Sequence, residues 1–257
     1  QLIHFFYMHQ LKYYLLIESS EVTGSKTLLQ LAVKGKTYLW EPYSAFSKRI
    51  YTISRNIYKN VYGNKVIFEE VNHDLNLTFI YEWNSSNIYG FVKKSKLINN
   101  SESIYQVKVI DGLQNILPCG VGEDLQKVSS NLVDAYKRNE LIADVGLGIY
   151  ALSSMIVDKA SPSEALKANT VWSFGIENPT YLLSSLQLDN FRRGNYIKQE
   201  VDVKAEKGAY FISFELELLP SLEKKWYTLA NVNQTVSDIN ALRQTILSEE
   251  NLDEIVQ

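Results

Sequence analysis

The sequence predicts a mainly β fold, a large antiparallel β-sandwich with one inserted helix and a helix at its C-terminal end. Three observations support this fold class. Short β-prone runs recur about every ten residues along most of the chain. The composition holds 17 Tyr, 10 Phe and 4 Trp, rings that pack well on a pleated, half-buried surface. Helical patterns do not alternate with strand patterns, which argues against a parallel α/β fold.

The bulk composition indicates a soluble globular domain with a sizeable core. Of the 257 residues, 46% are apolar and 21% are charged, and a β-sandwich of this length can form one domain. The 26 basic and 29 acidic side chains give a net charge of -3, which provides no electrostatic attraction for a polyanion. We therefore expect no nucleic-acid partner.

The N-terminal segment is apolar and aromatic, but polar residues interrupt it. His4, His9 and Lys12 fall within its first seventeen residues, so it fits neither a membrane span nor a signal sequence. We expect a strand or a packed helix there, no membrane association, and a cytoplasmic location. Because the chain begins with Gln1, we also expect it to be a piece of a longer protein.

The first strands are predicted as hairpins. Residues 28–33 and 37–40 flank the turn-forming Lys34-Gly35-Lys36, and a strand at 50–58 precedes a turn at 62–64. Turn residues thus separate each β-prone run from the next.

The clearest two-residue alternation lies in the middle of the chain, where every second residue from 75 to 83 is apolar or aromatic: Leu75, Leu77, Phe79, Tyr81 and Trp83. One face of this strand must be buried. After a turn at 84–87, strands are expected at 88–97 and 103–110. Three lysines there, Lys93, Lys94 and Lys96, are typical of a solvated sheet edge.

A break is predicted at 111–122 because Asp-Gly, Pro and two further glycines disfavour regular structure. A helix near 123–138 should follow it. Its acidic residues lie at the start and Lys137 and Arg138 at the end, as the helix dipole favours. Its apolar residues recur at helical spacing: Leu125, Val128, Leu132 and Tyr136.

Further strands are expected at 148–157, 163–174, 180–188, 197–203, 209–218 and 226–232. The sandwich domain is therefore assigned to 1–232. Residues 233–257 are assigned to a C-terminal helix that begins with a capping pattern at Thr235 and Asp238. Its apolar stripe is Ile239, Leu242, Ile246 and Leu247. A linker helix leading to another domain and a helix docked on the sandwich both explain this stripe.

The sequence contains no phosphate-binding loop, no Gly-x-Ser-x-Gly and no His-Glu-x-x-His, and its single cysteine, Cys119, excludes an internal disulfide. We expect no metal, no cofactor and no catalytic residue. His73 and Asp74 are adjacent, so in a strand they would face opposite ways, and a hydrogen bond at a strand bend is the expected role of His73. Glu215 and Glu217 are expected to form a solvated surface pair.

Aromatic rings beside polar side chains are the one pattern with a functional character. Flat rings together with amide and guanidinium donors commonly bind sugars. The candidate sugar contacts are Trp40, Arg49, Trp83 and Tyr89. The alternative is that about half of the aromatic residues in this region belong to the core.

Three segments resemble a known family. Residues 72–94 (NHDLNLTFIYEWNSSNIYGFVKK), 108–118 (KVIDGLQNILP) and 163–168 (SEALKA) resemble cellobiose-phosphorylase-like proteins of bacteria, the inverting glycoside phosphorylases of the glycosyltransferase 36 type. The resemblance implies an N-terminal, galactose-mutarotase-like super-sandwich joined by a linker helix to a C-terminal helical catalytic barrel. In that family the catalytic Asp and the phosphate site belong mainly to the barrel, so no catalytic residue is transferred to this chain.

Three functional hypotheses follow. The first is a non-catalytic N-terminal domain of a glycoside phosphorylase or hydrolase, which supports the active-site cleft or an oligomer interface. Its partners would be a carbohydrate, the helical catalytic domain and, in a homodimer, a second copy. The second is a stand-alone carbohydrate-binding module. The third is a mutarotase-like epimerase, which would need a histidine and a carboxylate in one pocket.

Overall fold

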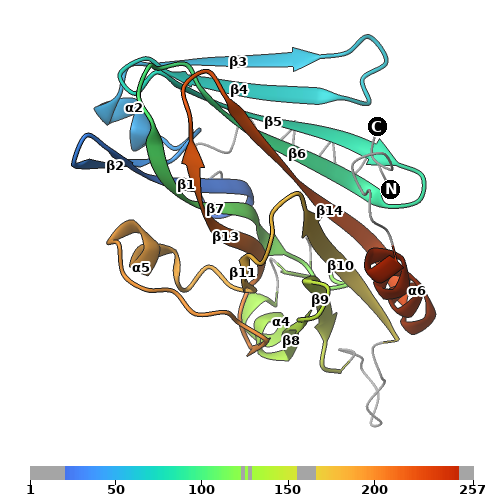
Figure 1. The fold of residues 1–257 in the computed structure, drawn as a ribbon. Coiled ribbons are helices and arrows are strands. Elements are labelled where there is room, and N and C mark those ends of the chain that lie inside the picture. Colours follow the sequence, from blue (N-terminus) through green and yellow to red (C-terminus); the bar gives the residue numbers. More distant parts are fainter. Residues whose placement is uncertain (1–20, 123–124, 127–128, 155–165, 249–257) are drawn as a thin grey trace.

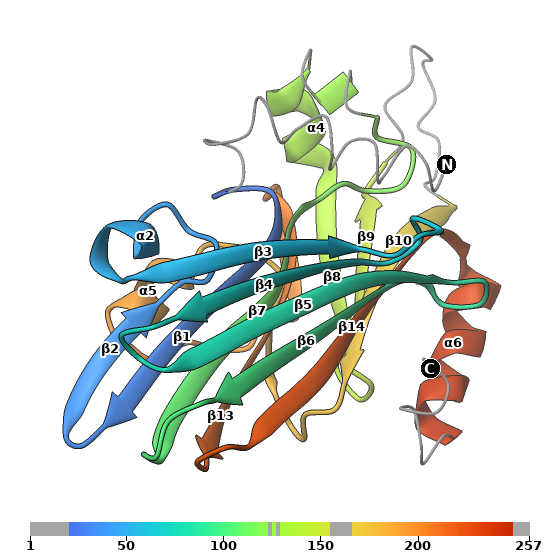
Figure 2. The same cartoon turned by 90° about the horizontal axis from the view of Figure 1, so that it is seen from above.

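The protein is a two-layer antiparallel β-sandwich, which confirms the predicted mainly β fold class (Figures 1 and 2). The computed structural model describes residues 21–122, 125–126, 129–154 and 166–248. A five-stranded sheet has the order β11 (Thr180–Leu182), β13 (Gly208–Leu218), β7 (Tyr105–Ile116), β1 (Gly24–Val33), β2 (Lys36–Trp40). A nine-stranded sheet has the order β12 (Asp202–Lys204), β8 (Lys137–Ile142), β9 (Leu147–Leu152), β10 (Lys167–Phe174), β14 (Glu223–Thr235), β6 (Gly90–Asn99), β5 (Leu77–Ser86), β4 (Val66–Asn72), β3 (Ile53–Lys59).

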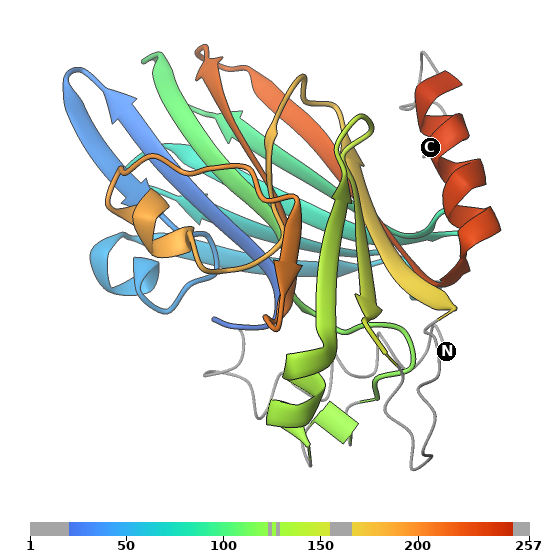
Figure 3. The ribbon, with the colours of Figure 1, turned by 90° about the horizontal axis from the view of Figure 1, so that it is seen from below.

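Helices lie at the ends and on the outer faces of the sandwich. They are α2 (Ser47–Ile50), α4 (Ser130–Tyr136), α5 (Leu188–Arg192) and α6 (Val236–Ser248). Figure 3 shows α5 over the five-stranded sheet and α6 beside β10 and β14 of the other sheet. Both helices cover apolar residues on the faces that point away from the main core.

Some predictions fall outside the described residues. They are the N-terminal strand or helix before residue 18, parts of the strands at 148–157 and 163–174, and the end of the C-terminal helix after residue 248. Within the part of the chain that the structure describes, every helix is too short or too polar to cross a membrane.

The first hairpin confirms the prediction made from Lys34-Gly35-Lys36. Strands β1 and β2 pair up to Val33 and Lys36, which leaves a two-residue turn. Both turn residues have positive φ, 49° at Lys34 and 74° at Gly35. A type I′ turn requires this conformation at both positions, and it matches the right-handed twist of the strands.

The main core lies between the sheets. The alternating face predicted from 75 to 83 is buried: Leu75, Leu77, Phe79, Tyr81 and Trp83 are each at most 7% exposed. They pack against residues of the five-stranded sheet, among them Leu29, Val109 and Ile212. The prediction that one face of this segment lies in the core is therefore confirmed.

The predicted break at Asp111-Gly112 is wrong. Both residues lie inside β7, which pairs with β1 on one side and β13 on the other. A Cβ atom at position 112 would lie 1.9 Å from the carbonyl oxygen of Tyr210 on β13. Glycine is needed at this position because two backbones approach closely inside a sheet, not because the chain turns.

The carboxylate of Asp111 joins the two sheets across the core. It accepts hydrogen bonds from four side chains: Thr27 Oγ1 at 2.6 Å, Lys93 Nζ at 2.7 Å, Trp226 Nε1 at 2.7 Å and Ser95 Oγ at 2.8 Å. Thr27 belongs to the five-stranded sheet, as Asp111 does, whereas the other three donors belong to the nine-stranded sheet. A buried charge is tolerated when it has a counter-ion and its hydrogen bonds are satisfied. Lys93 is the counter-ion of this carboxylate, and the other three side chains are neutral donors.

The prediction that Lys93 lies at a solvated edge is also wrong. Strand β6 is flanked by β14 and β5, and Lys93 is 0% exposed. Burial lowers the pKa of its ammonium group, although the neighbouring Asp111 opposes this shift. Lys94 and Lys96 point to the other face of the same strand, where Lys96 pairs with Glu223 at 3.3 Å.

The inserted helix ends earlier than predicted. Within the predicted range 123–138, residues 125–126 and the seven residues of α4 are helical, but Lys137 already begins β8. The buried residue is Val133, whereas Leu132 of the predicted apolar stripe is 49% exposed; Val128 lies outside the described residues. Pairing of β8 with β9 overrides the helical pattern at its end.

Two late strands are also shorter than predicted. Of the predicted strand at 180–188 only the first three residues form β11, and of the predicted strand at 197–203 only the last two belong to β12, which ends at Lys204. The chain between them is held by single backbone bonds, such as Glu200 N to Tyr181 O at 2.9 Å, and by the side chain of Glu200. The carboxylate of Glu200 accepts hydrogen bonds from Leu183 N at 2.7 Å and Ser184 Oγ at 3.0 Å.

The C-terminal helix begins with the predicted cap. The carboxylate of Asp238 accepts from Thr235 N at 2.9 Å, and the hydroxyl of Thr235 accepts from Asp238 N at 3.3 Å. Because β14 continues to Thr235, the strand passes the predicted boundary between 232 and 233. Ile239 and its neighbours in the stripe pack on the nine-stranded sheet, so the described part of this helix is docked.

Replacing Asp111 by alanine is expected to destabilise the protein by about 3–5 kcal/mol, since it leaves the buried ammonium of Lys93 without its counter-ion. Urea denaturation measures the free energy of unfolding. The control is Glu215→Ala, which removes an exposed ion pair with Lys108 and should cost less than about 1 kcal/mol. Equal losses in the two variants would contradict the role given to Asp111.

Replacing Gly112 by alanine is expected to cost about 1–3 kcal/mol or more, because the added methyl group overlaps the β13 backbone. The matched control is Gly122→Ala, where an added Cβ meets nothing within 4 Å. Thermal unfolding of both variants, followed by circular dichroism, gives the comparison. Equal melting temperatures of the two variants would contradict the close contact between Gly112 and β13.

Candidate functional site

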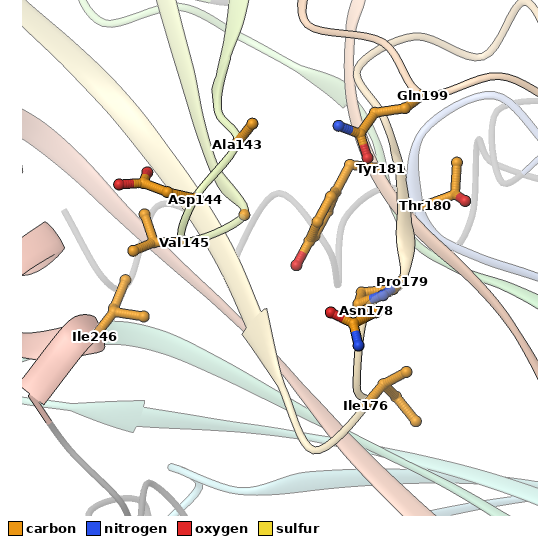
Figure 4. Close-up of a pocket in the computed structure, with 11 residues that line it drawn as sticks. Ala143, Asp144, Val145, Ile176, Asn178, Pro179, Thr180, Tyr181, Gln199 and Ile246 are labelled. Carbon is orange, nitrogen blue, oxygen red and sulfur yellow. The ribbon is translucent and has the colours of Figure 1, made fainter.

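An open depression of about 480 Å³ lies at one end of the sandwich (Figure 4). The β8–β9 turn, the loop between β10 and β11, and the last turns of α6 surround it. Its lining residues are Ala143, Asp144, Val145, Gly146, Ile176, Asn178, Pro179, Thr180, Tyr181, Gln199 and Ile246. We call this depression the end groove.

Tyr181 lies across the middle of the end groove (Figure 4). Strand β11 fixes its backbone by pairing it with Ile212 of β13. Its hydroxyl reaches the β8–β9 turn, where a Cβ at Gly146 would lie 2.1 Å from Tyr181 Oη, so glycine leaves the space for the phenol. Gly146 also accepts a hydrogen bond through its carbonyl oxygen from Tyr210 Oη at 2.7 Å. Burial raises the pKa of Tyr181 above its ordinary value, so the hydroxyl is a hydrogen-bond donor at neutral and at alkaline pH.

Asp144 forms the wall on the side of α6. Its carboxylate accepts hydrogen bonds from the guanidinium of Arg243, from Nε at 3.0 Å and from Nη2. The bond to Arg243 lowers the pKa of Asp144, so the carboxylate is ionised at neutral pH. The ion pair also ties α6 to the β8–β9 turn.

Two exposed amides complete the groove. Asn178 has a φ of 46°, a left-handed conformation that asparagine tolerates well, and Pro179 follows it. Gln199 lies on the side of the loop that precedes β12. A phenol, two amides and a carboxylate around a partly apolar floor suit a ligand rich in hydroxyl groups.

The buried carboxylate of Glu70 is fully engaged. It accepts hydrogen bonds from Trp40 Nε1 at 2.8 Å, from Tyr43 N at 2.7 Å and from Arg55 Nε at 2.6 Å. Glu70 belongs to the nine-stranded sheet and Trp40 to the five-stranded sheet. This cluster is therefore a second polar connection between the layers.

The buried carboxylate of Glu41 is engaged in the same way. It accepts from Arg192 Nε at 2.6 Å and lies 3.1 Å from Lys26 Nζ. Burial works to raise the pKa of Glu41, but the two cations outweigh burial and the pKa lies below its ordinary value. The contact fastens α5, which carries Arg192, to the end of β2.

The four predicted sugar contacts do not come together. Trp40 is 0% exposed and Trp83 is 4% exposed, so neither ring offers a face on which a sugar could stack. Arg49 is exposed on α2, and Tyr89 packs edge-on against Trp172 with ring centroids 6.1 Å apart. None of the four lines the end groove.

His73 lies at the exposed turn between β4 and β5. Its Nε2 is 2.8 Å from Ser54 Oγ, and the carboxylate of Asp74 accepts from Thr52 N at 2.7 Å. These are hydrogen bonds at a strand bend, as expected. His73 is not a groove residue, so the structure does not place a histidine and a carboxylate together in the end groove.

No sequence pattern predicts the end groove, since its residues come from separate loops. The only local signals are the turn-forming pair Asn178-Pro179 and the glycine at 146. Neither pattern says which loops meet. Among the described residues, no three His, Cys, Asp or Glu side chains gather as a metal site requires.

No protein-family model and no curated protein matches the chain. Solved structures with a similar arrangement include a polysaccharide lyase (11% identity, TM-score 0.43, covering 82% of this chain and 26% of that one). A putative kojibiose phosphorylase from the human microbiome is also similar (10% identity, TM-score 0.36, 86% and 25%). A galactose mutarotase related enzyme from Lactobacillus acidophilus is a third (12% identity, TM-score 0.33, 80% and 79%). The chain spans about a quarter of the length of the first two, and a likeness this weak assigns no activity.

Replacing Arg192 by glutamine is expected to lower the melting temperature at pH 7 and to do so less at acid pH. A carboxylate whose pKa is lowered on folding stabilises the protein above its ordinary pKa of 4.5, and this stabilisation is lost as the pH falls through the folded pKa. The difference from wild type should therefore shrink between about pH 5 and pH 3. Arg49→Gln, on the exposed face of α2, is the control. A difference that stays constant with pH would contradict the pairing with Glu41.

Proposed function

We propose that this chain is a non-catalytic domain of a carbohydrate-active enzyme, a glycoside phosphorylase or hydrolase whose reacting groups lie in another domain. The observation that carries this proposal is the state of the buried acids. Asp111, Glu70 and Glu41 are each bound by two or more internal donors. Cleavage of a glycosidic bond needs carboxylates placed on either side of that bond, and these three hold the fold together instead.

The sugar class is supported by the resemblance of residues 72–94 and 108–118 to cellobiose-phosphorylase-like proteins. In the structure these segments form β5 with its flanking turns, the first residues of β6 and most of β7. They contain Lys93 and Asp111, the ion pair that joins the sheets. The resemblance thus falls on the framework of the sandwich, as a supporting domain would require.

The end groove supports a place for this domain beside an active site. Ile246 of α6 lines it, and α6 extends to Ser248. A helical catalytic domain that follows α6 would start next to the groove. Its polar side chains would then form one wall of a cleft that holds a sugar.

A stand-alone carbohydrate-binding module is the second candidate. The end groove is open, and three of its exposed residues, Asp144, Asn178 and Gln199, are polar. Binding by the isolated chain distinguishes this candidate from a supporting domain, which needs its neighbour to complete the cleft.

Titration of the ¹⁵N-labelled chain with glucose, galactose and their disaccharides, followed by NMR, tests the groove. We expect millimolar or weaker shifts confined to groove residues, and Tyr181→Ala should abolish them. Tyr62→Ala, which changes a residue 90% exposed on the β3–β4 turn, should leave them unchanged. Micromolar affinity would favour the binding module.

The same chain, incubated with these disaccharides and inorganic phosphate, is expected to release no sugar and no sugar phosphate. Product analysis by anion-exchange chromatography gives the measurement. Turnover, or accelerated mutarotation of glucose or galactose measured by polarimetry, would overturn the assignment of a non-catalytic domain.

A further inference from the structure

Strand β3 is an open edge of the nine-stranded sheet. It forms the upper margin of the molecule in Figure 1, and in the described part of the chain only β4 pairs with it. Six of its seven residues are exposed. An uncovered edge presents backbone donors and acceptors to any strand that matches it.

The pairing with β4 fixes which backbone groups face outward. Thr52 O accepts from His73 N at 2.9 Å, and Asn60 N donates to Lys65 O at 3.2 Å. In an antiparallel ladder the bonding side alternates, so the even-numbered residues between these two point to β4. The backbone groups that face the open side therefore belong to Ile53, Arg55, Ile57 and Lys59.

Exposed apolar residues flank both ends of this strand. Val61 and Tyr62, on the turn to β4, are 99% and 90% exposed. Phe46 and Ile50, at α2 before the strand, are each 53% exposed. Apolar side chains that are exposed next to one another, and not singly, are typical of a contact surface.

We propose that a second copy of this chain pairs its β3 antiparallel to this one, about a two-fold axis at Asn56. In this register Ile53 faces Lys59 of the second copy and Arg55 faces Ile57. All four outward-facing residues of each strand then form hydrogen-bonded pairs, and the two nine-stranded sheets become continuous. This interface is independent of the sugar-related function proposed above.

Charge favours this register, although the ion pair of each Arg55 with Glu70 offsets part of its charge. A shift of two residues in one direction sets Arg55 against Arg55 of the second copy, and a shift in the other direction sets Arg55 against Lys59. Like charges directly opposite each other destabilise a strand pair. The register centred on Asn56 places each cation opposite an isoleucine and avoids both conflicts.

The same register covers the apolar ends. Counting along the two strands sets Val61 opposite Tyr51 of the second copy, next to Ile50. The Val61–Tyr62 turn of each copy therefore meets the Phe46–Ile50 end of the other. Because the axis is two-fold, this contact between the two apolar patches occurs at both ends of the interface, and the interface is self-complementary.

Sedimentation equilibrium of the 257-residue chain tests the association. The wild type should show twice the chain mass of 29.5 kDa. Ile57→Lys places a cation opposite Arg55 of the second copy at two symmetric points, and should weaken the dimer by about tenfold or more. Ile88→Lys, at a residue 75% exposed on the β5–β6 turn, should leave the wild-type dimer unchanged. A monomer at all concentrations, or a dimer unaffected by Ile57→Lys, overturns the proposal.

Disulfide trapping tests the register, in a Cys119→Ser background that removes the single native thiol. Asn56 would face its own copy in a pair without hydrogen bonds, with Cα atoms about 4.5 Å apart, a separation that a disulfide can span. Asn56→Cys should therefore form a covalent dimer on mild oxidation. Ser54→Cys, on the same face, is the control, because its two copies would lie about 13 Å apart along the strands. Equal cross-linking of the two variants would overturn the register.

Discussion

The ion pair between Asp111 and Lys93 is the interaction on which the sandwich depends. A carboxylate and an ammonium group that are both inaccessible to solvent are stable only if their partners stay in place. The partners of Asp111 come from β1, β6 and β14, so the relative position of the two sheets is fixed by a polar contact as well as by apolar packing. Trp40 and Glu70 make a similar contact between the layers.

These polar contacts also explain how the acids of the chain are distributed. The carboxylates in the interior bind internal donors, whereas those at the end groove and on the surface remain accessible. The framework and the accessible polar groups are therefore separate, and a ligand at the end groove would not disturb the ion pairs in the core.

The fold class could be predicted from the sequence, because alternation from Leu75 to Trp83 and the turn at Gly35 are local signals of strands and hairpins. Predictions failed where distant residues decide the structure. Asp111 and Gly112 form a turn signal, yet their partners on other strands place them inside β7. Lys93 is buried because β6 lies between β14 and β5 in the other sheet. The end groove was not predicted because Asp144, Tyr181 and Gln199 are far apart in sequence.

Strand β14 passes into α6 without an intervening loop, and the reciprocal bonds of Thr235 and Asp238 close the junction. A second fastening, Arg243 to Asp144, holds the helix farther along. Apolar packing of Ile239 on the nine-stranded sheet, together with these two contacts, holds the helix in one orientation. The sheet therefore sets the direction of α6. A domain joined to this helix would be supported rigidly by the sandwich and would not move freely on a flexible linker.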